Sequence, residues 1–164
     1  MLDSGNQAPD FSLPGTAPDS DDDIVEYSLS ATLTQRPAVL NFYLFDFHPE
    51  CRQNVCDLHD LSWFDLDTDV SVYGISTDSA YSHQEFAAQE SLEYPLLSDS
   101  DSRVAETYGV LADELAGHRH VARRSVFVID QQRKVRYAWA ADSPARQPDW
   151  DAVKDAVDRL KIKS

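Results

Sequence analysis

The stretch Ala38-Val-Leu-Asn-Phe-Tyr-Leu-Phe-Asp-Phe-His-Pro-Glu-Cys51 decides the fold of this chain. Its first six residues form an apolar run typical of a buried strand. Pro49 suits the first turn of a helix, because its missing N–H would be unbonded there, and we expect this helix to reach about Phe64. Unbonded backbone N–H groups and the positive end of the helix dipole favour a thiolate at such a position. Cys51 is therefore the first candidate for chemistry.

The chain has one other cysteine, Cys56, which lies five residues after Cys51. Two such thiols can be a redox pair, part of a metal site or buried inert side chains. On a helix, Cα atoms five residues apart are separated by roughly 8–9 Å. A disulfide spans only about 4.4–6.8 Å between Cα atoms. If the two thiols pair, we expect residues 48–57 to unwind locally first.

Length and composition restrict the class of protein. The 164 residues, 42% of them hydrophobic, suit one domain with a substantial core. No apolar run is long enough to span a membrane, and the start of the chain lacks the features of a secretory signal. We therefore expect a single domain over residues 1–164 and a cytoplasmic location.

Charge is strongly unbalanced, with 29 acidic residues against 14 basic ones and a formal net charge of −15. Such a surface repels the phosphates of nucleic acids and anionic lipids, so we expect neither nucleic acid nor a membrane as a partner. Aspartate supplies 22 of the acids, whereas only four of the bases are lysines. This composition is typical of proteins from salt-accumulating halophiles.

Strand and helix patterns alternate along the chain. The segment up to about Glu26, with three prolines and the acidic run Asp19–Asp23, is predicted to be an extended acidic arm with a solvated loop. The alternation after it predicts an α/β fold with a mixed sheet. Strands are expected at 70–76, 125–130 and 135–139, the last two as a hairpin, and helices from Asp78 or Ser79 to Glu90, from Asp99 or Ser100 to Gly109, and over 148–160.

Four segments follow one another in a familiar order: Ala8–Leu13, Gly74–Ser79, Tyr94–Asp99 and Arg124–Asp130. In them the chain resembles the peroxiredoxins, which are thioredoxin-fold peroxidases, and most closely the bacterioferritin-comigratory type. The resemblance implies a thioredoxin-like fold with a central mixed β-sheet flanked by helices, in a monomer or a homodimer. It also implies a peroxide substrate, a thioredoxin-like reductant and no cofactor.

The resemblance also implies the roles of individual residues. Cys51 falls on the peroxidatic cysteine, Cys56 on the resolving cysteine and Arg124 on the catalytic arginine of the family. Arg123 competes with Arg124, but alternation along a strand puts the two side chains on opposite faces. By the same resemblance Cys51 attacks the peroxide and becomes a sulfenic acid, which Cys56 converts to a disulfide. Arg124 lowers the pKa of the thiol and stabilises the developing charge.

The active-site loop departs from the family pattern at two positions. Leu44 and His48 stand where the family has a proline and a threonine. An imidazole can also donate and accept hydrogen bonds, and if protonated it favours a thiolate further, so His48 is expected to take part in catalysis. The residues expected to line the substrate pocket are Tyr43, Pro49 and Glu50.

Two other classes of function stay open at this point. The series His48-x2-Cys51-x4-Cys56-x2-His59 contains the ligand types of a tetrahedral zinc site, although these four residues do not share one face of a continuous helix. Alternatively, the changes at Leu44 and His48 fit a thioredoxin-fold binding or redox-sensor module that has lost activity. The other histidines, His83, His118 and His120, lie in polar segments and are predicted to be on the surface.

Overall fold

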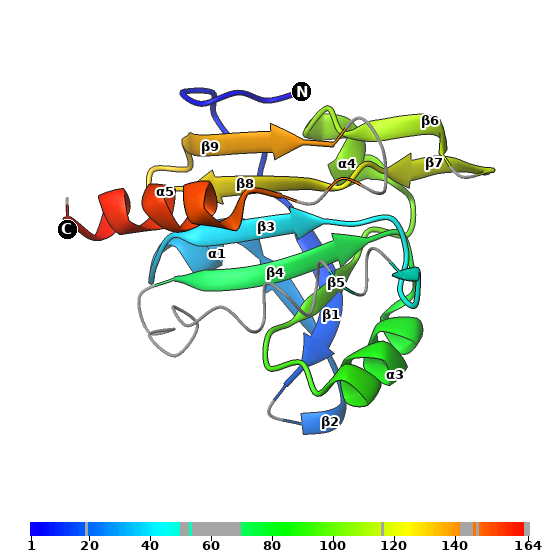
Figure 1. Ribbon diagram of the computed structural model, residues 1–164. Helices are drawn as coiled ribbons and strands as arrows, with labels where there is room; N and C mark the ends of the chain where they lie inside the picture. Colours follow the sequence, from blue (N-terminus) through cyan, green and yellow to red (C-terminus); the bar gives the residue numbers. More distant parts are fainter. Residues whose placement is uncertain are drawn as a thin grey trace.

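The computed structural model describes residues 1–18, 20–49, 53, 70–115, 117–141, 146 and 148–162. Its strands are β1 (Ser12–Ala17), β2 (Ser20–Ser28), β3 (Ala38–Phe42), β4 (Ser71–Ser76), β5 (Leu96–Ser98), β6 (Leu111–Leu115), β7 (His118–Ala122), β8 (Ser125–Ile129) and β9 (Val135–Ala140). Its helices are α1 (Leu29–Leu33), α3 (Ala80–Glu90), α4 (Arg103–Thr107) and α5 (Trp150–Ile162). Seven strands form one sheet in the order β2-β1-β5-β4-β3-β8-β9, and β6 pairs with β7 in a separate ribbon (Figure 1).

The centre of the sheet is mixed, because β3 runs parallel to β4 and antiparallel to β8. Alternate side chains of β3 serve two cores, with Leu40 and Phe42 in one and Val39 in the other. Helices α1 and α4 contribute to the first core, and α3 and α5 to the second. The sheet therefore lies between two layers of helices, which confirms the predicted thioredoxin-like α/β fold.

Several elements agree closely with the sequence patterns. β4 covers most of the predicted strand at 70–76, and the hairpin of β8 and β9 is present. Helix α3 begins after Ser79, whose hydroxyl accepts a hydrogen bond from the N–H of Ser82. This is the capping expected of a serine at that position. α5 corresponds to the final helix predicted over 148–160 but begins and ends two residues later.

The N-terminal part of the chain differs from the expected arm. Most of residues 12–28 form the hairpin of β1 and β2, and β1 also pairs with β5. Gly15 allows this close approach, because a Cβ there would lie only 2.8 Å from the carbonyl oxygen of Leu96. β2 is an edge strand of the sheet, a position in which charged residues are common.

Helix α4 and the ribbon of β6 and β7 also differ from expectation. α4 starts at Arg103, four residues after Asp99. The Asp99 carboxylate nevertheless accepts hydrogen bonds from the backbone N–H groups of Val104 and Ala105, in the first turn of this helix. The ribbon of β6 and β7 was not predicted. Of the helix predicted from Pro49 to Phe64, Pro49 and Gln53 are helical and the rest lies outside the described residues. No helix within the described part of the chain is long and apolar enough to cross a membrane.

Candidate active site

The candidate site lies where β3 and β4 end. Because these two strands are parallel, their carboxyl ends meet at the same edge of the sheet, and the backbone N–H of Tyr43 donates to the carbonyl of Ile75 there (3.0 Å). The loop of residues 43–49 leaves this edge toward Cys51, and the connection into α3 leaves it from β4. Carboxyl ends of parallel strands are where α/β folds commonly place their ligands.

Arg124 lies at the same edge. It immediately precedes β8, in which Ser125 is paired with Phe42, the last residue of β3. The Arg124 residue is only 2% exposed, and its Nη1 donates to the carbonyl oxygen of Arg146 (3.0 Å). Arg123 is exposed, so the two neighbouring arginines lie in opposite environments, as alternation predicts. A permanently charged cation is thus buried where the Cys51 loop begins, and there it would stabilise an anion.

Four other residues of the predicted active-site loop are described by the structure. Tyr43 and Leu44 are buried and belong to the core shared with α3 and α5, so a leucine is accommodated where the family has proline. His48 is half-buried and Pro49 is exposed. The remaining predicted residues lie outside the described part of the chain: Cys51, Cys56, Glu50 and the possible zinc ligand His59.

A buried network that sequence reasoning missed supports the loop. Asp46 accepts hydrogen bonds from the hydroxyl of Tyr43 (2.6 Å) and of Ser82 (2.9 Å), and its Oδ2 lies 2.7 Å from Nδ1 of His83. The predicted surface position of His83 is wrong, because this residue is 0% exposed. His118 and His120 are exposed, as predicted.

The pattern of α3 already contained a signal for the burial of His83. Ala80, His83 and Phe86 follow one another at three-residue intervals and are all buried, so they share the face of the helix that contacts the sheet. For Asp46 no such periodicity exists. Its loop position between two phenylalanines does not indicate burial, and only its partners in space reveal it.

Burial also affects the titration of this network. Desolvation, followed by the Asp46 carboxylate, raises the pKa of Tyr43 well above its ordinary value of 10.0, so the hydroxyl stays protonated and donates. Desolvation, again followed by Asp46, raises the pKa of Asp78 above 3.8. Asp78 nevertheless accepts hydrogen bonds from the backbone N–H of Asp46 (2.8 Å) and from the hydroxyl of Ser76 (2.6 Å). The loop is therefore attached to the β4–α3 connection through Asp78 and to α3 through Ser82 and His83.

The same side chains are the metal-ligand candidates within the described residues. One ligand atom each from Asp46, Asp78 and His83 lies within 4.8 Å of the others. Ligands that share a tetrahedral Zn²⁺ at about 2.05 Å are separated by roughly 3.3 Å. The nitrogen and oxygen of His83 and Asp46 are 2.7 Å apart, which is a hydrogen-bond distance. The geometry fits a hydrogen-bonded network better than a metal centre.

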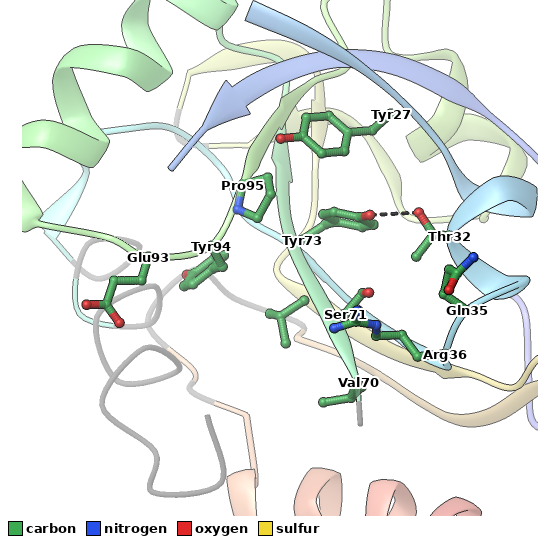
Figure 2. Close-up of a pocket in the computed structure, with 11 residues that line it drawn as sticks. Tyr27, Thr32, Gln35, Arg36, Val70, Ser71, Tyr73, Glu93, Tyr94 and Pro95 are labelled. Carbon is green, nitrogen blue, oxygen red and sulfur yellow. Dashed lines mark hydrogen bonds between the residues drawn. The ribbon is translucent and has the colours of Figure 1, made fainter. Parts of the chain in front are cut away.

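A cavity of about 370 Å³ lies at the opposite, amino ends of the same strands (Figure 2). Tyr27 and Tyr73 line it with ring centroids 5.4 Å apart and ring planes tilted by 60°, and Tyr73 shares a hydrogen bond of 2.7 Å with Thr32. Val70 and Ser71, at the start of β4, also line it, whereas Tyr43 and Arg124 belong to the other edge. The cavity is therefore separate from the predicted chemistry.

Comparison with known sequences gives a consistent result. The model of the AhpC/TSA family matches residues 4–138. A putative peroxiredoxin of Mycobacterium tuberculosis is 36% identical over 132 residues, which are 80% of this chain and 81% of that protein. The putative peroxiredoxin bcp of Coxiella burnetii is 33% identical over 141 residues, or 84% of this chain and 88% of the relative.

Solved structures agree with the sequence relatives. The crystal structure of peroxidoxin BcpB from Mycobacterium tuberculosis superposes with a TM-score of 0.78 at 30% identity, covering 99% of this chain and 98% of that one. A reduced 2-Cys peroxiredoxin of Plasmodium vivax gives a TM-score of 0.84 over 99% of this chain and 83% of that one. At 23% identity the second likeness concerns the fold alone.

Proposed function

The chain belongs to the AhpC/TSA family and is a peroxiredoxin-type thiol peroxidase, and from this premise we propose that Cys51 is the thiol that attacks the peroxide. The observation that carries the proposal is the burial of Arg124 at the edge of the sheet from which the Cys51 loop departs. A buried guanidinium favours a nearby thiolate over a thiol and stabilises charge on a breaking O–O bond.

The proposed reaction balances as follows. The Cys51 thiolate attacks one oxygen of hydrogen peroxide or of an organic hydroperoxide, an S–O bond forms and the O–O bond breaks. The sulfur loses two electrons and becomes a sulfenic acid, while the leaving oxygen takes a proton and departs as water or an alcohol. His48, which is half-buried in the same loop, supplies a group that donates or accepts a hydrogen bond in the pocket. Tyr43, Pro49 and Glu50 are proposed to line this pocket.

Regeneration is proposed to use the second cysteine. The Cys56 thiolate attacks the sulfenic sulfur, an S–S bond forms and the oxygen leaves as water. A thioredoxin-like dithiol then reduces the disulfide by exchange. Local unwinding of residues 48–57 would allow the two sulfurs to meet, since five residues of regular helix hold the Cα atoms too far apart.

The test is peroxide consumption with a thioredoxin system as reductant, in the wild type and in Cys51→Ser and Cys56→Ser. We expect Cys51→Ser to abolish turnover and Cys56→Ser to weaken it or to make it depend on other thiols. Assays belong in molar salt as well as in dilute buffer, because a net charge of −15 destabilises the folded chain when it is not screened. Folded, metal-free wild type without turnover would overturn the proposal, and bound zinc would favour the metal site instead.

A further inference from the structure

The pair of Asp46 and His83 has no part in the reaction proposed above, yet it joins the loop of residues 43–49 to α3. Asp46 belongs to this loop and is five residues before Cys51 in the chain, and His83 is a residue of α3. The two side chains are 1% and 0% exposed, and Oδ2 and Nδ1 are 2.7 Å apart. Burying polar groups is costly unless they are hydrogen-bonded to one another.

The contacts of His83 fix the orientation of its ring. Nε2 lies 2.9 Å from the carbonyl oxygen of Leu97, which can only accept, so Nε2 donates there. Nδ1 faces a carboxylate oxygen that also accepts from Ser82, while the other oxygen accepts from Tyr43. Both oxygens of Asp46 are therefore held, one of them by side chains of α3.

The backbone beyond Asp46 needs support. Phe47 has φ of 67°, a left-handed conformation that costs a residue with a side chain roughly 1–2 kcal/mol. The turn closes where the N–H of His48 donates to the carbonyl of Phe45 (3.4 Å), and the Phe47 ring packs edge-on against Phe86 of α3 at 5.1 Å. Such strain persists only where the surroundings hold it. α3 supplies this support in two places: Ser82 and His83 contact Asp46, and Phe86 contacts the Phe47 ring.

We propose that His83 is a positioning residue for the reaction at Cys51, an inference that rests on the function proposed above. Its contact with Asp46 attaches the loop to α3 and thereby holds the strained turn at Phe47. This turn sets the direction of the chain at His48 and Pro49. The unwinding expected over residues 48–57 then begins after the turn, while Asp46 and the residues before it stay in place.

Two substitutions of His83 separate positioning from bulk packing. The amide nitrogen of an asparagine lies about where Nδ1 lies in histidine, and that of a glutamine lies about where Nε2 lies. His83→Asn therefore keeps a donor toward Asp46, whereas His83→Gln keeps a donor toward Leu97. Both variants replace the buried ring with a neutral amide, and His83→Asn loses one methylene more of packing than His83→Gln, so a slower His83→Gln cannot be explained by lost packing.

Both substitutions are made on a Cys56→Ser background, which leaves Cys51 as the only thiol of the chain. The first readout is the single-turnover rate of Cys51 oxidation by hydrogen peroxide. The second is the rate of Cys51 alkylation by iodoacetamide across pH, which reports the thiolate without any peroxide chemistry. Urea midpoints measure the stability of each variant. We expect His83→Gln to slow both reactions about tenfold, and His83→Asn to stay within about threefold of the background.

Equal slowing in the two variants, or slowing that only follows the urea midpoints, would overturn the inference. If His83→Gln does not fold, Asp46→Asn decides, because it keeps the size of the side chain but removes the carboxylate that faces Nδ1 of His83. Unchanged oxidation and alkylation in this variant would also overturn the inference. A background protein that peroxide does not oxidise would refute the proposed function alone, since the order of alkylation rates still tests His83.

Discussion

The two ends of the central strands β3 and β4 differ in what they bury. At the carboxyl ends, Asp46, His83 and Arg124 are all less than 10% exposed, whereas near the amino end of β3 the buried Asp130 is paired with the exposed Arg136. The cavity of about 370 Å³ lies at the amino ends, and the hydroxyls of Tyr73 and Thr32 share a hydrogen bond at its wall (Figure 2). Burying charged and polar groups is costly, so a cluster of them is a candidate functional site. The proposed function therefore places the reaction at the carboxyl ends and leaves the cavity without a part in it.

The largest effect is expected where the buried network loses its shared acceptor. Asp46→Ala leaves the hydroxyls of Tyr43 and Ser82 and the ring of His83 without their buried partner, so we expect the free energy of unfolding to fall by about 3–5 kcal/mol. Urea denaturation measures this loss. Asp113→Ala, at an exposed aspartate of β6, is the control and should change stability by less than about 0.5 kcal/mol. A similarly small change in Asp46→Ala would mean that this network contributes little to stability.

Arg124 tests whether the enclosed charge at the carboxyl end serves the reaction. Arg124→Lys keeps the charge but loses the planar fork of donors, so we expect Cys51 oxidation to slow by about 100-fold. Stopped-flow single-turnover rates give the number. Arg123→Lys changes the exposed neighbour in the same way and should leave the rate alone. Equal rates for the two variants would show that the burial of Arg124 is only structural.

The amino end should affect stability without affecting catalysis. Tyr73→Phe removes the hydroxyl that shares a 2.7 Å hydrogen bond with Thr32, and we expect a loss of about 1 kcal/mol in the free energy of unfolding. Peroxide turnover should match that of the wild type. Tyr81→Phe is the control, because Tyr81 is 77% exposed. A slower peroxidase with Tyr73→Phe would break the contrast between the two ends.

The smallest effect concerns the pH dependence of stability. The pKa of Asp78 is raised by desolvation and then by Asp46, so the folded chain binds this proton more tightly than the unfolded chain does. Its stabilising contribution is present at low pH and is lost as pH rises above 3.8 through the raised pKa. Between about pH 4 and about pH 7, Asp78→Asn should therefore lose less stability than the wild type does. Parallel urea midpoints across this range would contradict the assignment.

Local patterns in the chain predicted most of the fold. The apolar run of β3, the serine cap of α3 and the hairpin of β8 and β9 each depend on a window of a few residues. The first hairpin was harder to predict, because its prolines and acidic residues resemble those of a loop. Its pairing with β5 depends on the small size of Gly15, which only the neighbouring strand makes relevant.

In the candidate site, too, local sequence patterns could indicate some residues and not others. Arg124 was assigned by the resemblance of its segment to the family; the structure buries it, and its role stays a prediction. His83 was assigned to the surface because its immediate neighbours are polar, although its spacing from Ala80 and Phe86 already put it on their face. Asp46 carried no local signal at all.

By itself the sequence determined the strand that leads to Cys51, the alternation of helices and strands, and the family to which the chain belongs. These properties are written in consecutive residues, since periodicity, capping and motif spacing act over one or two turns. Only the tertiary structure decided that Asp46 and His83, which are 37 residues apart, share a hydrogen bond. It also decided that Arg124 lies next to the end of β3. Both depend on which strands pair and which helix face meets the sheet, and partners so distant in the chain meet only once the core has packed.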